Sequence, residues 1–343
     1  MKKYLLILSA CLAASAASAA PSKAAVRYRA PEHCSDTANL VWRACGLEVA
    51  NSYVLSIAYC GNLDDSAERR ACVEEASTAR SEGTQTCAAQ HEARDQICDE
   101  MGESRYDPDF DPANFESDFR NLVNTNRYFP LGIGNRWEYA GSSEKVQLEV
   151  LNRTKIIEGV NCLVVRDQVF KNGQLAEDTD DWFAQGKDGS VWYCGEEVKD
   201  YESFATDRPP TPELVTIDGS FKAGRDGARP GIIFQGNPTV GMLYREEFSL
   251  ANAEDVSRVV STTYRRGTVP ALDRGVPAAL MNLLCRGDCV VLEAFTAQSP
   301  GVVERKFFAP GIGFIFQINL STAVTVQLVR CNFDSRCANL PQL

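Results

Sequence analysis

Six cysteines near the N-terminus constrain the fold of this chain more than any other sequence feature. Successive cysteines on each side of residue 66 are 11 or 15 residues apart, and such steps return to nearly the same face of an α-helix with its roughly 3.6 residues per turn. Residues 61–65 are typical of a turn, and Asp65 with Glu68 resembles a helix N-cap. The segment 30–102 therefore predicts a hairpin of two antiparallel helices, over about residues 33–60 and 66–99. The six residues are Cys34, Cys45, Cys60, Cys72, Cys87 and Cys98.

The symmetry of these cysteines also predicts how they pair. In an antiparallel hairpin centred on residue 66, three disulfides form successive rungs, Cys34–Cys98, Cys45–Cys87 and Cys60–Cys72. About fifteen connectivities are open to any six cysteines, and the symmetry selects this one. Two helices bury little core, so the disulfides are expected to stabilise the hairpin. A redox role is disfavoured, because none of the six has the close spacing that activates a thiolate.

The N-terminus predicts export from the cytoplasm. Residues 1–19 have a basic start, an apolar run and an Ala-Ser-Ala cleavage site, which is the pattern of a signal peptide. A competing interpretation is a lipobox, Leu8-Ser9-Ala10-Cys11, which would make Cys11 a lipid anchor. The apolar run before Cys11 is short, which favours simple export. We therefore expect a periplasmic or secreted protein, with an outer-membrane lipoprotein as the alternative, and no later segment is long enough to span a membrane.

The net charge and the number of cysteines limit the classes of partner and cofactor that we expect. The chain has 35 basic and 46 acidic residues, and removal of Lys2 and Lys3 with the signal peptide leaves a net charge of about −13. Such a negative charge disfavours binding to nucleic acid, whose phosphates are also negative. The chain has 13 cysteines, and the even number left without Cys11 predicts six disulfides in an exported protein. No zinc site or other cofactor is expected, because no C-x-x-C pair occurs and His33 and His91 are the only histidines.

An acidic stretch at residues 103–127 resembles a calcium loop only in part. Asp107, Asp109 and Asp111 occupy the first three ligand positions of an EF-hand loop. The required glycine is replaced by Pro112, and the terminal glutamate by Asp118. The favoured prediction is a linker whose Phe110 and Phe115 dock onto the next domain. A metal site at the three aspartates is the alternative.

Residues 128–343 predict an antiparallel β domain. Short alternating runs are separated by glycine, proline and asparagine, and several are joined by hairpin signals. Residues 276–284 predict one short helix. The expected fold class is thus α+β, a disulfide-linked helical hairpin followed by a half-barrel or open curved sheet. Six cysteines remain in this domain. Cys162 and Cys194 could cross-link neighbouring strands, and Cys285–Cys289 and Cys331–Cys337 could close small local loops, but no symmetry supports these pairs, so the sequence leaves the pairing of the six open.

The richest candidate site is the predicted hairpin at residues 177–197. With a turn at residues 186–189, Trp182 would lie opposite Tyr193, and Phe183 opposite Trp192. One such aromatic pair would face a ligand, and the acidic neighbours Asp181 and Glu196 could form a paired-carboxylate site of the glycosidase type. A packed aromatic hairpin with a solvated acidic rim is the favoured interpretation. Arg225 and Arg229, in a glycine-rich loop, are further candidate ligand contacts.

Several motifs resemble a family of exported bacterial proteins of unknown function. They are Tyr128-Phe129-Pro130-Leu131-x-x-Gly134-Asn135-x-Trp137, Glu177-Asp178-Thr179-x-Asp181-Trp182-Phe183-Ala184-Gln185, and Gly189-x-Val191-Trp192-Tyr193-x-Gly195-Glu196. The resemblance covers about residues 107–318 and implies no activity. Residues 307–313 are similar to a hairpin ending in periplasmic half-barrel proteins of the lipoprotein-carrier type, which is a likeness of fold alone.

The residue inventory favours a binding protein over an enzyme. Both histidines fall in the helical hairpin, so the β domain has no Ser-His or Cys-His nucleophile system. The first hypothesis is an exported, non-enzymatic binding protein for an apolar or amphipathic ligand in the cell envelope. The second is a carboxylate-dependent enzyme on polysaccharide that uses Asp181 and Glu196. The third is a structural or adhesive envelope protein that acts through a patch along Trp42, Tyr53 and Tyr59.

Overall fold

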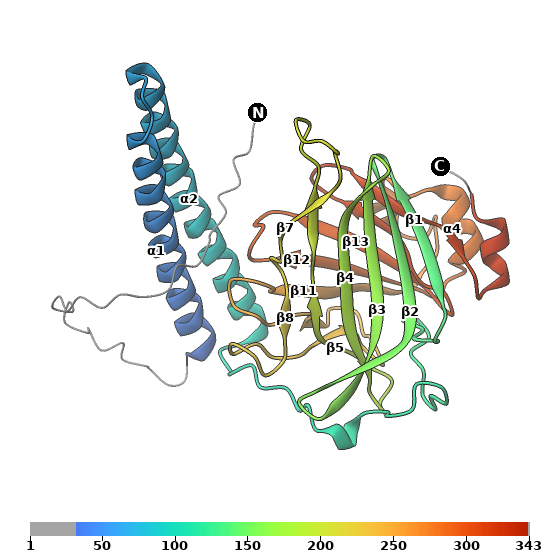
Figure 1. Cartoon of the computed structure of the whole chain (residues 1–343). Coiled ribbons are helices and arrows are strands. Elements are labelled where there is room, and N and C mark those ends of the chain that lie inside the picture. The colour runs from blue at the N-terminus through green and yellow to red at the C-terminus, as the bar shows by residue number, and fades with distance from the viewer. Residues whose placement is uncertain (1–31, 342–343) are drawn as a thin grey trace.

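The hairpin of two helices predicted for the N-terminal region is present. The computed structural model describes residues 32–341, so the predicted signal peptide (residues 1–19) and Cys11 lie outside the described residues. Helix α1 (His33–Gly61) and helix α2 (Ser66–Met101) run antiparallel to each other (Figure 1). The Asp65 side chain accepts hydrogen bonds from the N–H groups of Ala67 and Glu68, each at 2.8 Å, and so caps the start of α2.

Three disulfides connect the two helices in the predicted order. They are Cys34–Cys98, Cys45–Cys87 and Cys60–Cys72. The helices bury few side chains between them; in α1 only Ala38, Val41 and Cys60 are buried. Because this pair of helices lacks a core of its own, the covalent links supply constraint that packing does not.

A single antiparallel sheet follows the hairpin. Within the described residues it has 15 strands, and its main path runs β10-β11-β12-β13-β14-β15-β1-β2-β3-β4-β5-β8. Strands β10 and β8 at the two ends do not pair, so the sheet is not closed. The strands are β1 (Arg136–Gly141), β2 (Glu144–Ile157), β3 (Val160–Lys171), β4 (Gln174–Gln185), β5 (Val191–Glu197), β6 (Asp200–Glu202), β7 (Glu213–Thr216), β8 (Phe221–Lys222), β9 (Gly231–Phe234), β10 (Leu243–Arg245), β11 (Asp255–Tyr264), β12 (Cys289–Thr296), β13 (Val303–Ala309), β14 (Gly313–Asn319) and β15 (Thr325–Cys331).

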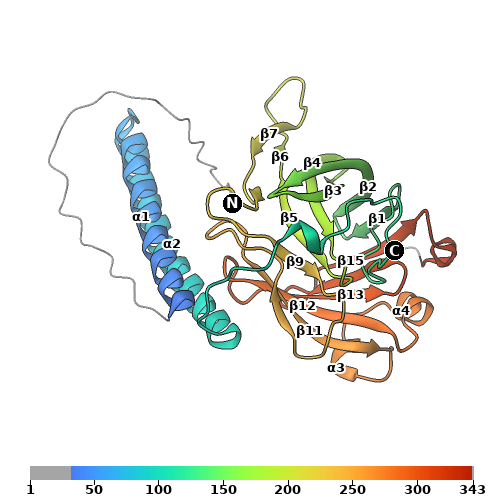
Figure 2. The same cartoon turned by 90° about the horizontal axis from the view of Figure 1, so that it is seen from below.

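The sheet curves into a half-barrel, which confirms the predicted α+β fold class. Seen from below, strands β11 to β13 lie across from strands β2 to β4 (Figure 2). The main core includes Leu163, Tyr264, Leu292, Phe307 and Phe316. Short helices α3 (Pro270–Asp273) and α4 (Ala278–Leu284) add to this core, and α4 lies where a helix was predicted.

Residues 102–135 connect the hairpin to β1. Phe110 and Phe115 pack against the outer face of the sheet, whereas Phe119 and Leu131 belong to the main core. Phe110 and Phe115 contact Trp192, with ring centroids 5.7 and 5.6 Å away, so the predicted docking of these two rings is confirmed. The 3-10 helix η1 (Pro112–Asn114) lies between them, and Asp111 caps it. Near the C-terminus a second 3-10 helix, η2 (Ser335–Asn339), follows β15.

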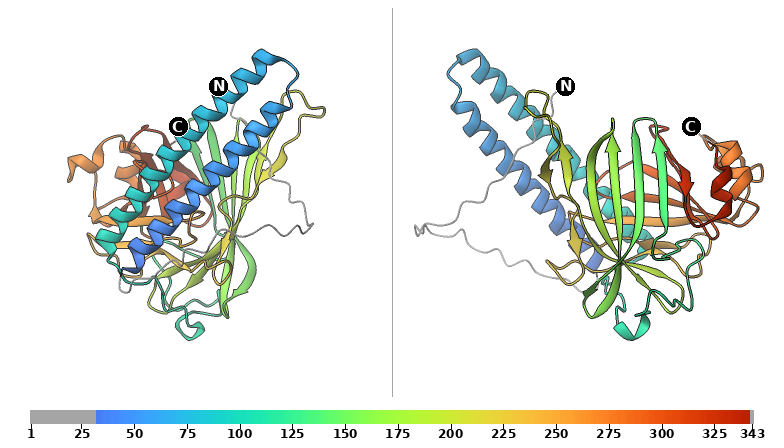
Figure 3. Two further views of the ribbon diagram at one scale, coloured as in Figure 1. Left: turned by 90° about the vertical axis from the view of Figure 1, so that its left-hand side faces the viewer. Right: turned by 45° about the vertical axis from the view of Figure 1, so that its right-hand side comes forward.

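Only the base of the hairpin contacts the sheet. Ile97 of α2 packs with Val256 and Ala297 in a small apolar cluster, while the far end of the hairpin projects beyond the sheet (Figure 3). Gln90 also donates a hydrogen bond to the Gln298 carbonyl at 2.9 Å. The hairpin is thus attached at one end and free of the sheet at the other.

The structure gives the pairing of the remaining cysteines, which the sequence left open. The disulfides are Cys162–Cys194, Cys285–Cys289 and Cys331–Cys337. Cys162 and Cys194 lie on β3 and β5, which flank β4, and not on adjacent strands as expected. Six disulfides favour an oxidising, extracytoplasmic compartment. Among residues 32–341, the structure has no helix with the length and apolar character needed to cross a membrane.

Candidate functional site

The concave face of the half-barrel contains a cavity of about 300 Å³, which we call the barrel cavity. Its size falls at the lower end of the range usual for small-molecule sites. Aromatic side chains form much of its wall: Trp137, Tyr139, Phe183, Tyr193, Phe308 and Phe314. Alternation along each strand places them there, since residues two apart point to the same face. Trp137 donates its indole N–H to the Ile312 carbonyl at 2.8 Å, which leaves the apolar ring to line the cavity.

Carboxylates form the other part of the wall. Asp167 of β3, Asp181 of β4, Glu246, Glu247 and Asp255 all line the cavity, and Lys306 of β13 is the basic residue among the lining side chains of the described chain. Such a concentration of like charge inside a sheet is costly, because each carboxylate loses its hydration and repels its neighbours. Carboxyl groups kept there despite this cost point to a functional site.

Asp181, which lines the cavity, is paired with Glu196, which does not line it. The two residues lie directly opposite each other on β4 and β5. The Tyr193 hydroxyl donates a short hydrogen bond to Asp181 Oδ1. Burial, opposed by this hydrogen bond, raises the pKa of Asp181 to about 7. Burial and the charge of Asp181 raise the pKa of Glu196 well above its usual value. Both shifts favour the protonated forms of the two carboxyl groups.

Lys306 partly compensates the cluster. Its Nζ atom lies 3.9 Å from Glu246 Oε2, and Glu246 Oε1 accepts a hydrogen bond from the Ser257 hydroxyl at 2.5 Å. Burial lowers the pKa of Lys306. The charges of the surrounding carboxylates, that of Glu246 most of all, raise it by more, so the pKa of Lys306 lies above its usual value. Burial also raises the pKa of Glu246 and, well above its usual value, that of Glu247.

Asp167 has an oxygen atom without a partner. Its Oδ1 atom is buried and accepts no hydrogen bond from the described residues. Burial, followed by the charge of Asp181, raises the pKa of Asp167 well above its usual value. Buried polar atoms are nearly always hydrogen-bonded in native proteins, and an exception next to a cavity calls for an explanation. A ligand that donates a hydrogen bond would supply the missing partner.

The structure places the predicted ligand contacts at different sites. Of these residues, only Tyr193 lines the barrel cavity. Trp182 and Trp192 belong to the cluster on the outer face of the sheet, where Lys155 Nζ lies 3.4 Å from the centroid of the Trp182 ring. Arg225 is in an exposed turn with its Nε atom 3.3 Å from Asp226. Arg229 pairs with Asp107 at 3.4 Å, near the base of the hairpin.

The predicted register of the β4–β5 hairpin is wrong by one residue. Phe183 lies opposite Tyr193, and Ala184 lies opposite Trp192. The connection extends from Gly186 to Ser190, because the Gly186 N–H bonds to the Ser190 carbonyl at 2.8 Å. This turn is one residue longer than the predicted one, and a slip of one residue changes which side chains share a face. Tyr193 therefore joins Phe183 and Asp181 inside the half-barrel.

Sequence analysis missed Asp167, Glu246, Glu247, Asp255 and Lys306. A signal was present for Asp167, since Leu163 and Val165 are core residues of the same strand and Asp167 continues their face. A charged residue at an inward position of an amphipathic strand marks a functional site or a paired charge. For the others, the inward face depends on strand pairings that the local sequence does not specify.

The acidic linker gives no support to a calcium site. Among the described residues, no group of three or more His, Cys, Asp or Glu side chains could hold a metal ion. Each aspartate makes a separate local contact. Asp107 pairs with Arg229, Asp109 accepts a hydrogen bond from Asn114 at 3.0 Å, and Asp111 accepts one from the Ala113 N–H at 2.8 Å.

No family model, curated protein or solved structure matches this chain. The resemblance to exported bacterial proteins of unknown function therefore stays a prediction. The site must be interpreted from its own geometry.

Proposed function

We propose that this protein is an exported, non-enzymatic binding protein that holds an amphipathic ligand in the barrel cavity. The apolar part of the ligand contacts Trp137, Phe183 and Phe314, and its polar end faces the carboxylates. The observation that carries the proposal is the division of the cavity wall into an aromatic part and a carboxylate part that includes Asp167 with its unpartnered oxygen. Such a wall suits a ligand with one apolar end and one hydrogen-bond-donating end.

The charge of the wall selects the polar end of the ligand. A protonated amine donates several hydrogen bonds. It also favours the ionised forms of Asp181 and Asp167, whose pKa values burial raises, because it offsets the charge that they then carry. An anionic head group would be repelled by the same carboxylates and would leave the Asp167 oxygen without a donor. The expected ligand class is thus an amphiphile with a cationic amine.

Three probes of equal chain length test this proposal. Octylamine, octanol and octanoate are titrated into protein purified from the periplasm, and binding is measured by calorimetry and native mass spectrometry. We expect saturable binding of octylamine, weaker binding of octanol and none of octanoate. Equal affinity for the three probes, or no binding of octylamine, would refute the proposal.

Variants locate the binding site. Asp167→Asn and Asp181→Asn should each weaken octylamine binding by tenfold or more, because each removes a carboxylate from the cavity. Asp180→Asn is the matched control, since Asp180 is the neighbour of Asp181 and pairs with Arg153 on the other face of the strand. It should bind octylamine as the unmodified protein does.

The polysaccharide-active enzyme is the second candidate, and the proximity of Asp181 and Glu196 favours it. A carboxyl group with a pKa of about 7 can act as a general acid at neutral pH. Two features favour binding over catalysis. The pKa of Glu196 is also raised, so neither carboxyl is clearly the ionised partner that a glycosidase needs. Trp182 and Trp192, which this hypothesis places beside the carboxylates, lie on the outer face.

A release assay separates the two candidates. The protein is incubated with soluble cell-envelope polysaccharides, and new reducing ends are measured. The binding proposal predicts no release. Release that is abolished by both Asp181→Asn and Glu196→Gln would instead support the enzyme.

The structural or adhesive alternative concerns the hairpin and not the cavity. The side chains of Trp42 and Tyr59 are 44% and 60% exposed, as that alternative expects. Tyr53 is more protected, because the Arg80 guanidinium lies 4.7 Å from the centroid of its ring. These exposed rings do not contact the barrel cavity, so this alternative can be tested independently of ligand binding.

A further inference from the structure

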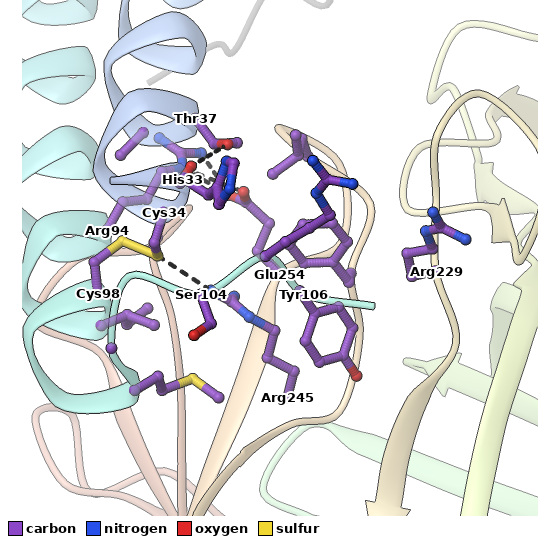
Figure 4. A pocket seen from close by; sticks show the side chains of 18 residues that line it. His33, Cys34, Thr37, Arg94, Cys98, Ser104, Tyr106, Arg229, Arg245 and Glu254 are labelled. Carbon is purple, nitrogen blue, oxygen red and sulfur yellow. Dashed lines mark hydrogen bonds and ion pairs between the residues drawn. A yellow bond between two sulfur atoms is a disulfide. The ribbon is translucent and has the colours of Figure 1, made fainter. Parts of the chain in front are cut away.

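A second cavity lies at the base of the hairpin, away from the barrel cavity, and we call it the hairpin pocket. Its volume is about 450 Å³. The start of α1, the end of α2, residues 102–106 and the segments around β10 surround it (Figure 4). Four arginines line it, Arg94, Arg105, Arg229 and Arg245, and Glu254 supplies the one carboxylate among the described lining residues, although Arg229 also pairs with Asp107 outside the lining. In a chain with a net charge of −11, this local excess of positive charge is unusual.

Arg94 and Glu254 are buried charged residues that line the pocket. Their side chains are 7% and 4% exposed, and Arg94 Nη2 lies 2.5 Å from Glu254 Oε2. Arg94 Nε also donates to both oxygens, at 3.2 and 3.0 Å. The remaining nitrogen, Nη1, is buried and has no hydrogen-bond partner among the described residues. A buried cationic N–H group without an acceptor is costly, and a ligand oxygen would satisfy it.

Arg245 is the second cation that faces the pocket. No carboxylate of the described residues lies within ion-pair distance of its guanidinium, since Glu254 is engaged by Arg94. Its Nη2 atom points to the sulfur of Cys34 at 3.9 Å (Figure 4). The guanidinium carbon lies 5.7 and 5.1 Å from the ring centroids of Tyr106 and Phe248, which hold it by cation–π contacts. These contacts position the guanidinium without neutralising it.

Backbone N–H groups at the N-terminus of helix α1 already have hydrogen-bond acceptors. The Glu103 carbonyl accepts from the His33 N–H at 3.1 Å, and the Glu103 carboxylate accepts from the Ser35 N–H at 2.9 Å. An anion in the pocket would therefore contact the arginines and not the helix N-terminus. Figure 4 places Arg245 close to Tyr106 and Ser104, whereas Arg229 stands apart at the edge.

Apolar groups complete the wall. Ile97, Met101, Phe248, Leu250 and the Cys34–Cys98 disulfide line the pocket beside the arginines. A free inorganic ion would leave most of this surface uncovered, whereas an apolar body attached to an oxyanion would contact it. Guanidinium groups bind carboxylate and phosphate oxygens with the same fork geometry.

We propose that the hairpin pocket binds a small organic anion, a carboxylate or phosphate group on an apolar or aromatic body, with Arg245 and Arg94 Nη1 as the anion contacts. This site is separate from the barrel cavity and takes a ligand of the opposite charge. Because parts of the hairpin and of the half-barrel both contact it, the bound anion would also strengthen their association.

Calorimetric titration of the full-length exported protein tests the site with four probes: phenyl phosphate, benzoate, inorganic phosphate and benzylamine. We expect saturable binding of phenyl phosphate or benzoate, at least tenfold weaker binding of inorganic phosphate, and none of benzylamine in this pocket. Preference for phenyl phosphate assigns the site to phosphate esters, and preference for benzoate assigns it to carboxylates. Absence of saturable binding by both aromatic anions would overturn the proposal.

Substitutions establish the location. Arg245→Gln should weaken binding of the preferred aromatic anion by tenfold or more. Arg258→Gln is the matched control, because Arg258 also joins the half-barrel to the hairpin, through Glu100 at 2.5 Å, but does not line the pocket. Should Arg245→Gln fail to fold, Arg105→Gln at the exposed rim should still weaken binding measurably. Unchanged affinity in folded Arg245→Gln protein would refute the assignment.

Discussion

At the scale of single residues, Asp181 in the barrel cavity makes the stability of the fold depend on pH. Its pKa is raised to about 7, first by burial. A carboxyl whose pKa is higher in the folded than in the unfolded state stabilises the fold while it is protonated. That stabilisation is complete below the unfolded pKa and is lost as the pH rises through about 7. Asp167 and Glu196, whose pKa values are raised by burial, act in the same direction.

We therefore expect the free energy of unfolding to be lower at pH 8 than at pH 5.5, by about 2 kcal/mol or more. Urea denaturation at both pH values measures it. Both pH values lie above about 5, because at lower pH the protein also loses the stabilisation that the ionised Asp178 carboxylate contributes. The hydrogen bond from Arg166 lowers the pKa of Asp178, so this stabilisation is lost as Asp178 becomes protonated. Asp181→Asn should reduce the pH dependence, whereas Asp180→Asn should not. Equal stability at the two pH values would contradict the buried carboxylate cluster.

Gly195 shows how one residue without a side chain allows β5 and β8 to approach each other closely. Its φ is +134°, and a Cβ atom added there would lie 2.3 Å from the Phe221 carbonyl oxygen. Gly195→Ala should therefore lower the free energy of unfolding by about 2–4 kcal/mol. Gly173→Ala is the control, because it also has a positive φ but open space around its Cβ position, and it should cost about 1 kcal/mol. Urea denaturation of both variants compares the costs, and equal values would show that the contact with Phe221 is unimportant.

The residue scale also marks the limit of prediction for the site. The sequence identified Asp181, Glu196 and Tyr193 as candidates, and the structure brings them together. It did not give the correct register, because the length of the turn at residues 186–190 depends on hydrogen bonds that the local sequence leaves open. The aromatic residues were therefore assigned to the wrong faces.

At the scale of elements, the disulfide ladder replaces a core between α1 and α2. The Cys45–Cys87 disulfide closes a sequence separation of 42 residues, which corresponds to about 4 kcal/mol in the chain-entropy model. We expect a Cys45→Ala, Cys87→Ala double variant to lose about this much stability in the hairpin while the half-barrel remains folded. Hydrogen exchange should then increase across residues 40–90 and stay unchanged in strands β11 to β13.

A smaller loop supplies the comparison. Cys331–Cys337 spans a separation of 6 residues, so the same double substitution there should cost about 2 kcal/mol in the chain-entropy model and leave the hairpin unaffected. If the two double variants showed the same hydrogen exchange in the hairpin, the disulfide ladder would not stabilise the helices.

Elements with a strong local signal were predictable, and elements defined by pairing were not. The hairpin followed from cysteine spacing, and most long strands followed from alternation. Strands β6, β7, β8 and β9 were missed, because each has between 2 and 4 residues and exists only through its partner strand. Such short strands carry too few residues for an alternating pattern to be recognised.

At the scale of the whole molecule, the two cavities differ in charge. Carboxylates line the barrel cavity, whereas arginines line the hairpin pocket. Sequence analysis could not foresee this separation, since Arg94 and Arg245 are 151 positions apart in the chain and meet only through the docking of α2 on β10 and β11. The net charge indicates an acidic protein and gives no sign of a basic pocket.

The buried Arg94–Glu254 pair joins the hairpin to the half-barrel. Glu254→Gln leaves the Arg94 charge buried without its partner, and breaking a buried pair in this way costs about 3–5 kcal/mol. The matched control is Glu100→Gln, which removes an exposed pair with Arg258 across the same contact and should cost less than about 1 kcal/mol.

The cost should appear where the two parts meet. In Glu254→Gln protein, hydrogen exchange should increase at residues 94–103, and the linker at residues 103–127 should become more sensitive to protease, because the hairpin separates from the half-barrel more often. Strands β1 to β4 should keep their protection. If the Glu254→Gln and Glu100→Gln variants behaved alike, the buried pair would not hold the hairpin in place, and the shape of the hairpin pocket would depend on the apolar contacts of Ile97 instead.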